Sequence, residues 1–266
     1  MLTMIRKINS FLSAQLGIDL GRLGLALVAL PKFFQDWNEF RKGTTQKIVL
    51  KPCLHDSAEE GGTAKGEYFW QDLYVARMIY QAKPVRHVDI GSRFDGFVAH
   101  VASYREIEVI DIRPIQAVIP GVVFMRMDMM SSKVTMENYC DSISCLHALE
   151  HFGLGRYGDP LDPEGHVKGL QNIAKLLKLS GRLYLSVPIG LERIEFNANR
   201  VFCPERMVEL AKQTGFVLDQ LAWIAKDQPV VASTDPLTDI QSLKKMHYAL
   251  GIFVFTKQSE LKFPKY

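Results

Sequence analysis

The segment VDIGSRFDG (Val88–Gly96) carries the strongest indication of the fold in this sequence. Its first residues are typical of a buried strand, Gly91 permits a tight turn, and the residues from Phe97 onward are typical of a helix. In open α/β sheets, ligands bind where such turns gather, beyond the carboxyl ends of the strands. The stretch therefore predicts a ligand site at the turn.

From Arg86 onward, β-rich runs alternate with helix-like and loop-like intervals. Seven strands are expected, at residues His87–Ile90, Ile107–Ile112, Val122–Met127, Ser142–Leu146, Arg182–Val187, Phe216–Ile224 and Tyr248–Thr256. Helices are expected at Tyr68–Gln81, Phe97–Tyr104, Gly169–Leu179 and Pro204–Thr214. This rhythm predicts a Rossmann-like α/β fold, in which a seven-stranded, mostly parallel sheet has helices on both faces. We expect this domain over residues 67–266, after an N-terminal helical extension and loop over residues 1–66.

The composition is that of an ordinary globular protein, with 47% apolar and 23% charged residues. A net charge of +3 without a dense Lys/Arg block gives no indication of nucleic-acid binding. The four cysteines form no CxxC pair, which favours a reduced, cytoplasmic setting. No apolar run is long enough to cross a membrane. The amphipathic start, Met1–Leu16, predicts a helix that packs on the domain, on a membrane surface or on a second copy in a homodimer.

Two acidic residues follow at the ends of expected strands. Asp111, in EVIDIRP (Glu108–Pro114), lies 20 residues after Gly91. There a carboxylate accepts hydrogen bonds from both ribose hydroxyls of a cofactor. Asp128, in FMRMD (Phe124–Asp128), is either an acceptor for an adenine amino group or a helix cap.

Two cofactor classes use a glycine turn followed by such a carboxylate. A dinucleotide requires GxGxxG, because the middle glycine lets the pyrophosphate approach the backbone, and here Arg93 takes that position. S-adenosylmethionine has no phosphate, and its ammonium group suits Asp89. The residues therefore favour S-adenosylmethionine over NAD, with a purely structural turn as the third interpretation.

Two more segments complete a series of motifs: DSISCLHALEHFG (Asp141–Gly153) and LLKLSGRLYLSVP (Leu176–Pro188). In this order, over residues 67–257, the motifs resemble the class I S-adenosylmethionine-dependent methyltransferases. More narrowly, YFWQDLY (Tyr68–Tyr74) and GLGRYGDP (Gly153–Pro160) are similar to an uncharacterised methyltransferase-like family described only as a domain of unknown function. Some bacterial members of that family occur near surface-polysaccharide genes.

The resemblance implies a transferase with S-adenosylmethionine as cofactor and a small-molecule or glycan acceptor. It also implies the cofactor contacts. The methionine end would be held by Asp89, Gly91 and Ser92, and the ribose by Asp111. The adenine ring would be held by Ile112, Asp128 and Met129, and Cys145 and Leu146 would lie beneath the cofactor. Arg93 departs from the family's glycine-rich turn. That departure favours one alternative, a non-catalytic cofactor-binding or scaffold protein. A second alternative, an NAD-dependent oxidoreductase, is disfavoured by Arg93.

A hydroxyl acceptor needs a base to take its proton. His147 and His151 are the candidates, with Glu150 as an orienting group or a second base, and helix-start packing is the alternative role for each. The same residues form HxxEH, the inverted zinc-protease signature. Because His147 directly follows a β-rich run and no clear third ligand follows on a helix, we predict no metal site, although metal-assisted methyl transfer stays an alternative.

The segment Gly153–Gly165 is expected to face the acceptor, because loops at this edge of the sheet carry specificity. Its candidate contacts are Arg156, Tyr157 and Asp159. The two prolines and four glycines of the segment would equally explain a plain cluster of surface turns.

Overall fold

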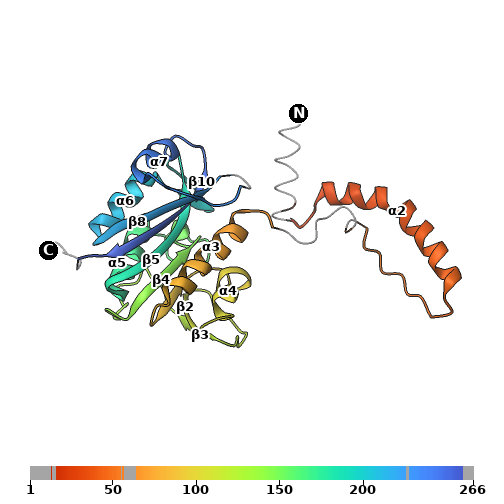
Figure 1. Ribbon diagram of the computed structural model, residues 1–266, viewed down its shortest axis with the longest axis horizontal. Helices are drawn as coiled ribbons and strands as arrows, with labels where there is room; N and C mark the ends of the chain where they lie inside the picture. Colours follow the sequence, from red (N-terminus) through yellow and green to blue (C-terminus); the bar gives the residue numbers. More distant parts are fainter. Residues whose placement is uncertain (1–12, 14–15, 55, 57–63, 226–227, 260–266) are drawn as a thin grey trace. The chain divides into compact units, whose positions relative to one another are not determined.

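The computed structural model describes residue 13, residues 16–54, residue 56, residues 64–225 and residues 228–259. The chain divides into two units, Met1–Thr63 and Ala64–Tyr266, which are described separately (Figure 1). Nearly all of the predicted helix Met1–Leu16 lies outside the described residues. In the part of the chain that the structure describes, no helix is both long enough and apolar enough to cross a membrane.

The main element of the first unit is helix α2 (Leu20–Phe40), which is followed by the short turn η2 (Arg41–Gly43). Asp19 caps α2, because its side chain accepts hydrogen bonds from the backbone N–H groups of Gly21 at 2.8 Å and Arg22 at 3.2 Å. None of the residues in α2 is buried.

An eight-stranded sheet forms the centre of the second unit, with the order β3-β2-β1-β4-β5-β10-β8-β9 (Figure 1). Strands β1 to β5 pair with one another in parallel, whereas β10 is antiparallel to both β5 and β8. The strands are β1 (His87–Ile90), β2 (Ile107–Asp111), β3 (Val122–Arg126), β4 (Cys140–Leu146), β5 (Leu177–Ile189), β8 (Phe216–Ile224), β9 (Val231–Ala232) and β10 (Ala249–Lys257). A separate hairpin pairs β6 (Arg193–Glu195) with β7 (Asn199–Val201).

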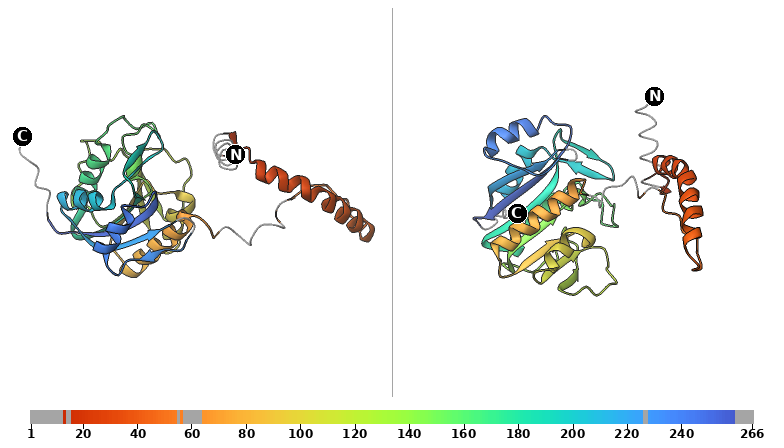
Figure 2. Two further views of the ribbon diagram at one scale, coloured as in Figure 1. Left: turned by 90° about the horizontal axis from the view of Figure 1, so that it is seen from above. Right: turned by 45° about the vertical axis from the view of Figure 1, so that its right-hand side comes forward.

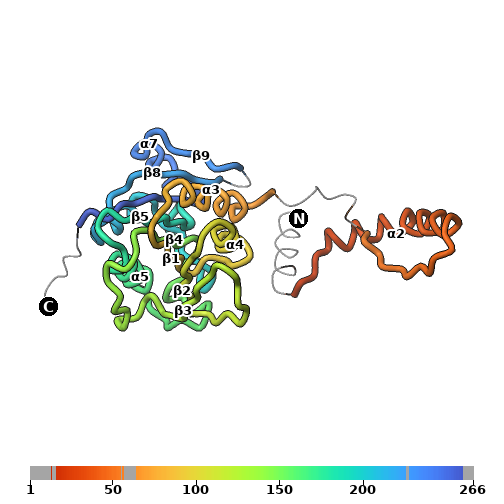
Figure 3. The backbone as a smooth tube through the Cα atoms, turned by 60° about the horizontal axis from the view of Figure 1, so that its bottom comes forward, coloured from red at the N-terminus to blue at the C-terminus, as the bar shows by residue number. Residues whose placement is uncertain are grey.

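Helices cover both faces of the sheet, with one apolar cluster on each face. One face is covered by helices α3 (Glu67–Ala82) and α4 (Ala99–Ala102) and by the turn η4 (Phe94–Val98), which share the cluster that contains Val75 and Val101. Figure 2 shows α3 crossing this face, and Figure 3 shows it beside α4. Helices α5 (Gly165–Leu176), α6 (Pro204–Gln213) and α7 (Pro236–Leu243) share the cluster that contains Leu170 and Met207. Burial of these apolar faces is the main force that holds the layers together.

The predicted Rossmann-like fold is confirmed, and its elements differ from the prediction in several details. The sheet gains an eighth strand because the two residues of β9 pair with the edge of β8. The predicted helix Gly169–Leu179 is wrong at both ends. Helix α5 begins at Gly165 and ends at Leu176, and β5 begins at Leu177, which pairs with Cys140 and accepts a hydrogen bond from the Lys257 ammonium group at 2.8 Å.

Candidate functional site

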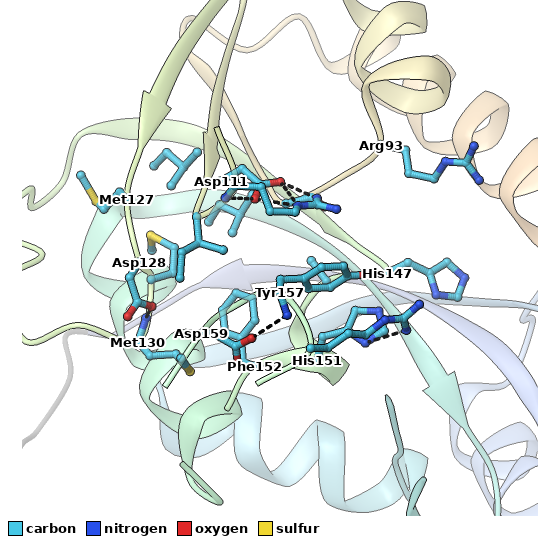
Figure 4. A pocket seen from close by; sticks show the side chains of 18 of the residues that line it. Arg93, Asp111, Met127, Asp128, Met130, His147, His151, Phe152, Tyr157 and Asp159 are labelled. Atoms are coloured by element: carbon cyan, nitrogen blue, oxygen red, sulfur yellow. Dashed lines mark hydrogen bonds and ion pairs between the residues drawn. The ribbon is translucent and has the colours of Figure 1, made fainter. Parts of the chain in front are cut away.

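A cavity of about 330 Å³ opens at the carboxyl ends of β1, β2 and β3 (Figure 4). Its wall also includes the residues that follow β4 and the first turn of α3. Ten residues predicted from the sequence line it: Gly91, Asp111, Ile112, Asp128, Met129, His147, His151, Arg156, Tyr157 and Asp159. One cavity thus joins the predicted cofactor, catalytic and acceptor residues.

Gly91 forms the floor of the cavity next to the end of β1. Its φ angle is +72°, a conformation that favours glycine, and a Cβ atom added there would lie 2.9 Å from the Cβ atom of Ala148. Its N–H group donates a hydrogen bond to the carbonyl oxygen of Ile110 at 2.9 Å, which ties the turn to β2. The turn is therefore held against the neighbouring strand and leaves its upper surface open to a ligand.

Asp111 lies in the middle of the cavity and is buried (Figure 4). The Arg113 guanidinium covers its carboxylate, with Nη2 2.5 Å from Oδ2 and Nε 3.0 Å from Oδ1. The backbone N–H group of Arg113 donates to Oδ1 as well, at 2.8 Å. The carboxylate that the sequence predicts to bind ribose thus lines the cavity and forms a bidentate ion pair with Arg113.

Asp128 lines the cavity among sulfur-containing side chains (Figure 4). Its Oδ1 atom accepts a hydrogen bond from the backbone N–H group of Met130 at 2.8 Å. Met127, Met129 and Met130 line the wall around it. The carboxylate therefore stabilises a turn and also faces an apolar, polarisable wall of a kind that suits a flat aromatic ring.

Four of the predicted cofactor residues lie beneath the lining of the cavity and are buried: Asp89, Ser92, Cys145 and Leu146. Ser92 donates two hydrogen bonds to Asp89, from its N–H group at 3.0 Å and from its hydroxyl at 2.6 Å, and Ser144 donates a third at 2.5 Å. The ring of His87 joins this network through Ser142 at 2.8 Å and Ser144 at 3.1 Å. In this structure the network supports the turn from below.

This network is expected to make the fold sensitive to acid. Burial lowers the pKa of His87 to about 3 and raises the pKa of Asp89 to about 6. Between pH 6.5 and 3 the unfolded chain binds a proton at His87 that the folded chain does not, so stability falls as the pH falls through this window. Asp89 acts in the opposite direction between pH 6 and 3.8, but its shift is smaller, and we expect His87 to dominate.

Urea unfolding of the wild type and of His87→Asn between pH 7 and pH 4 tests this prediction. The wild type should lose stability on acidification, whereas the variant, which keeps only the Asp89 contribution from this network, should lose less or gain. The comparison is between the two pH slopes, so a constant cost of the substitution does not affect it. Equal slopes in both proteins would show that His87 does not control the acid sensitivity.

His147 follows β4 immediately, with a φ angle of +52°. This left-handed backbone is uncommon outside glycine and asparagine, and strain of this kind gathers at functional sites. The Nδ1 atom lies 2.8 Å from Oε1 of Glu150, and Nε2 lies 3.5 Å from Oε1 of Glu67. The ring of Tyr68 packs over the imidazole, with 4.5 Å between the ring centroids.

The electrostatic surroundings favour a proton on His147. Burial alone would lower its pKa, but the hydrogen bond to the buried Glu150 carboxylate and the charge of Glu67 hold the pKa of His147 above its ordinary value. In contrast, burial lowers the pKa of His151, whose Nδ1–H group donates to the carbonyl oxygen of Ala198 at 2.7 Å. The two histidines therefore differ in the direction of their pKa shifts and in their hydrogen-bond partners.

The zinc-protease signature requires both histidines on one helix, and His147 and His151 do not share one. Only a single turn, η5 (Leu149–His151), lies between β4 and the following loop, and it begins after His147. Within the described ranges, no group of three or more His, Cys, Asp and Glu side chains is arranged to hold a metal ion.

The loop after η5 is organised by Asp159. One carboxylate oxygen accepts hydrogen bonds from the N–H groups of Gly153 at 2.9 Å and Gly155 at 3.1 Å, and the other accepts from Tyr157 at 3.1 Å. Arg156 donates to the carbonyl oxygen of Ala198 at 2.8 Å. Asp159 thus shapes the loop, while Arg156 and Tyr157 project from it.

The cavity also contains residues that our sequence analysis did not assign to a site. Arg113 could have been predicted to line the cavity, since it comes two residues after Asp111 in the sequence. No feature of the sequence indicated Tyr68, because it lies on α3, far from the other lining residues in the sequence. The full set of unassigned lining residues is Tyr68, Ile90, Arg93, Ile110, Arg113, Met127, Met130, Ala148 and Phe152.

Comparison with solved structures finds methyltransferases that resemble this chain in fold. A candidate sarcosine dimethylglycine methyltransferase from Galdieria sulphuraria aligns with a TM-score of 0.50 and 13% identity, over 71% of this chain and 86% of that one. The 1,6-didemethyltoxoflavin-N1-methyltransferase of Burkholderia thailandensis, solved with S-adenosylhomocysteine, aligns with a TM-score of 0.49 and 13% identity, over 71% and 79%. At 13% identity, the match with a TM-score of 0.50 bears on the fold alone.

Residues 122–250, just under half of the chain, match a protein family described as Caenorhabditis protein of unknown function, DUF268. This finding agrees with the sequence resemblance to a family known only as a domain of unknown function. No curated protein sequence matches the chain.

Proposed function

We propose that this chain is an S-adenosylmethionine-dependent methyltransferase with a small-molecule or sugar acceptor. The observation that carries the proposal is the shared cavity, which joins the Gly91 turn, the Asp111 carboxylate and His147. The neighbour from Burkholderia thailandensis was solved with S-adenosylhomocysteine, the product of this cofactor. One candidate acceptor is a surface-polysaccharide building block, and the support for it is the family resemblance alone.

The residues of the cavity fit the cofactor. Gly91 leaves room for close approach at the floor, Asp111 offers a carboxylate to a ribose diol, and the methionines around Asp128 offer an apolar wall to an adenine ring. Arg93 stands where a dinucleotide needs glycine, so the fit to NAD is poorer. When bound, S-adenosylmethionine supplies a methyl group on a sulfonium, which an aligned nucleophile can attack.

His147 is the proposed base for the acceptor hydroxyl. A ring that donates from Nδ1 to Glu150 has its Nε2 lone pair free to take a proton, and Glu67 lies close enough to stabilise the resulting imidazolium. Nε2 is buried, and the Tyr68 ring packs over the imidazole. Since Tyr68 is itself 36% exposed, we expect it to move aside when the acceptor enters.

Calorimetry on the full chain tests the proposal. S-adenosylmethionine and S-adenosylhomocysteine should bind, and NAD should not. Methyl transfer from labelled S-adenosylmethionine to a panel of sugars then identifies turnover. Binding of NAD alone would favour an oxidoreductase, and cofactor binding without transfer to any acceptor would favour a non-catalytic cofactor-binding protein.

A further inference from the structure

The three arginines that line the cavity differ in whether a carboxylate neutralises their charge. Arg93 is paired with Asp95 at 2.6 Å, and Arg113 with Asp111 at 2.5 Å. Among the described residues, no carboxylate lies within ion-pair distance of Arg156, whose hydrogen bond goes to a backbone carbonyl. The nearby Asp159 carboxylate is already used by three backbone N–H groups. One guanidinium in the wall of the cavity therefore has no anionic partner.

Tyr157 connects this guanidinium to Arg113. The guanidinium carbon of Arg113 lies 4.5 Å from the centroid of the Tyr157 ring, and that of Arg156 lies 5.2 Å from it. Both distances are typical of cation–π contacts. We call these three residues the Arg113–Tyr157–Arg156 stack. All of them line the cavity, so the stack presents two guanidinium groups around one aromatic ring.

The partner of Arg113 is the carboxylate that the proposed cofactor needs. A carboxylate offers about four lone-pair positions. On Asp111, Oδ1 already accepts from the N–H and Nε groups of Arg113, and Oδ2 accepts from its Nη2 group. A ribose diol that bonds to both oxygens must therefore displace part of this ion pair. The freed guanidinium is already in contact with Tyr157 and stays in the stack.

We propose that the methyl acceptor carries an anionic group, a carboxylate or a phosphate, and that the Arg113–Tyr157–Arg156 stack binds it. This inference rests on the proposed function and names its substrate class. Arg156 is available to the anion at all times, whereas Arg113 becomes available when a nucleoside occupies Asp111. Cofactor binding therefore strengthens acceptor binding, and by linkage the reverse holds equally.

Direct binding measurements on the full chain test the inference with glucuronate, glucose 1-phosphate and glucose as probes. Each probe is titrated with and without saturating 5′-methylthioadenosine, which has the ribose diol but no carboxylate of its own. We expect the anionic sugars to bind about 10-fold more tightly than glucose, and more tightly still with the nucleoside, because charge-assisted hydrogen bonds are worth about this factor each. The two anionic probes separate carboxylate from phosphate recognition.

Three variants locate the effect. Arg156→Gln should weaken binding of the anionic probes about 10-fold and leave 5′-methylthioadenosine binding unchanged. Arg113→Gln should retain nucleoside binding but lose the coupling between nucleoside and anion. Arg206→Gln is the matched control, since it removes one positive charge from α6, where the Arg206 side chain is 76% exposed and paired with Glu192. We expect it to bind all ligands like the wild type.

The possible failures are distinct. If 5′-methylthioadenosine and S-adenosylhomocysteine both fail to bind, the proposed function is wrong and this inference falls with it. If the nucleoside binds but glucose binds as tightly as the anionic sugars, or no probe binds, the acceptor class is wrong and the cofactor site stands. Equal anion binding by Arg156→Gln and the wild type would also overturn the inference.

Discussion

Replacing Asp111 by alanine is expected to lower the affinity for S-adenosylhomocysteine by about 100-fold or more. Asp111 is buried at the end of β2 and lines the cavity next to the Gly91 turn. A ribose diol would donate two hydrogen bonds to its carboxylate, and each bond to a charged group contributes about 1.5–3 kcal/mol. Calorimetry with S-adenosylhomocysteine measures the loss directly.

Two comparisons make the Asp111 result specific. Asp219→Ala removes a carboxylate from β8, where Asp219 accepts a hydrogen bond from Thr256 outside the cavity, and should leave the affinity unchanged. Arg113→Gln should keep or raise the affinity, because Arg113 competes with the diol for Asp111. Thermal unfolding confirms that each variant is folded. An affinity of Asp111→Ala within 3-fold of the wild type (about 0.7 kcal/mol) would place the nucleoside elsewhere.

Replacing His147 by asparagine is expected to lower kcat by about 10²–10⁴-fold, the usual contribution of a general base. Asparagine is chosen because it tolerates the left-handed backbone at this position, where φ is +52°. The backbone after β4 should then keep its path, and the variant should bind S-adenosylhomocysteine with nearly unchanged affinity. Labelled methyl transfer at saturating cofactor measures the effect.

The pH profile distinguishes a base from a structural residue. The base must be neutral, so the wild-type rate should rise with pH through the pKa of His147, which its carboxylate neighbours hold above the ordinary histidine value. This limb should be absent from His147→Asn. His151→Asn is the matched control, since it removes a second imidazole from the same cavity and should keep the limb. A His147→Asn rate close to that of the wild type would show that His147 is not the base.

Local sequence features predicted the parts of this protein that depend on neighbouring residues in the chain. The strands His87–Ile90 and Phe216–Ile224 have the predicted bounds, because their side-chain pattern reflects burial directly. The spacing of Gly91 and Asp111 also predicted their meeting in one cavity. Adjacent parallel strands end at the same edge of a sheet, so a turn after β1 and a carboxylate closing β2 come together once the fold is given.

The pairing of the polar groups could not be predicted from the sequence and became known from the folded structure. Arg113 covers Asp111, Glu67 and Tyr68 approach His147 from α3, and Asp89 lies beneath the cavity instead of at its surface. Each of these contacts depends on the direction of a side chain and on the lone pairs that remain free. Several of the contacts join segments that are far apart in the chain. Periodicity and spacing record which face of an element is buried, but they carry no information about which distant partner meets a given polar atom there.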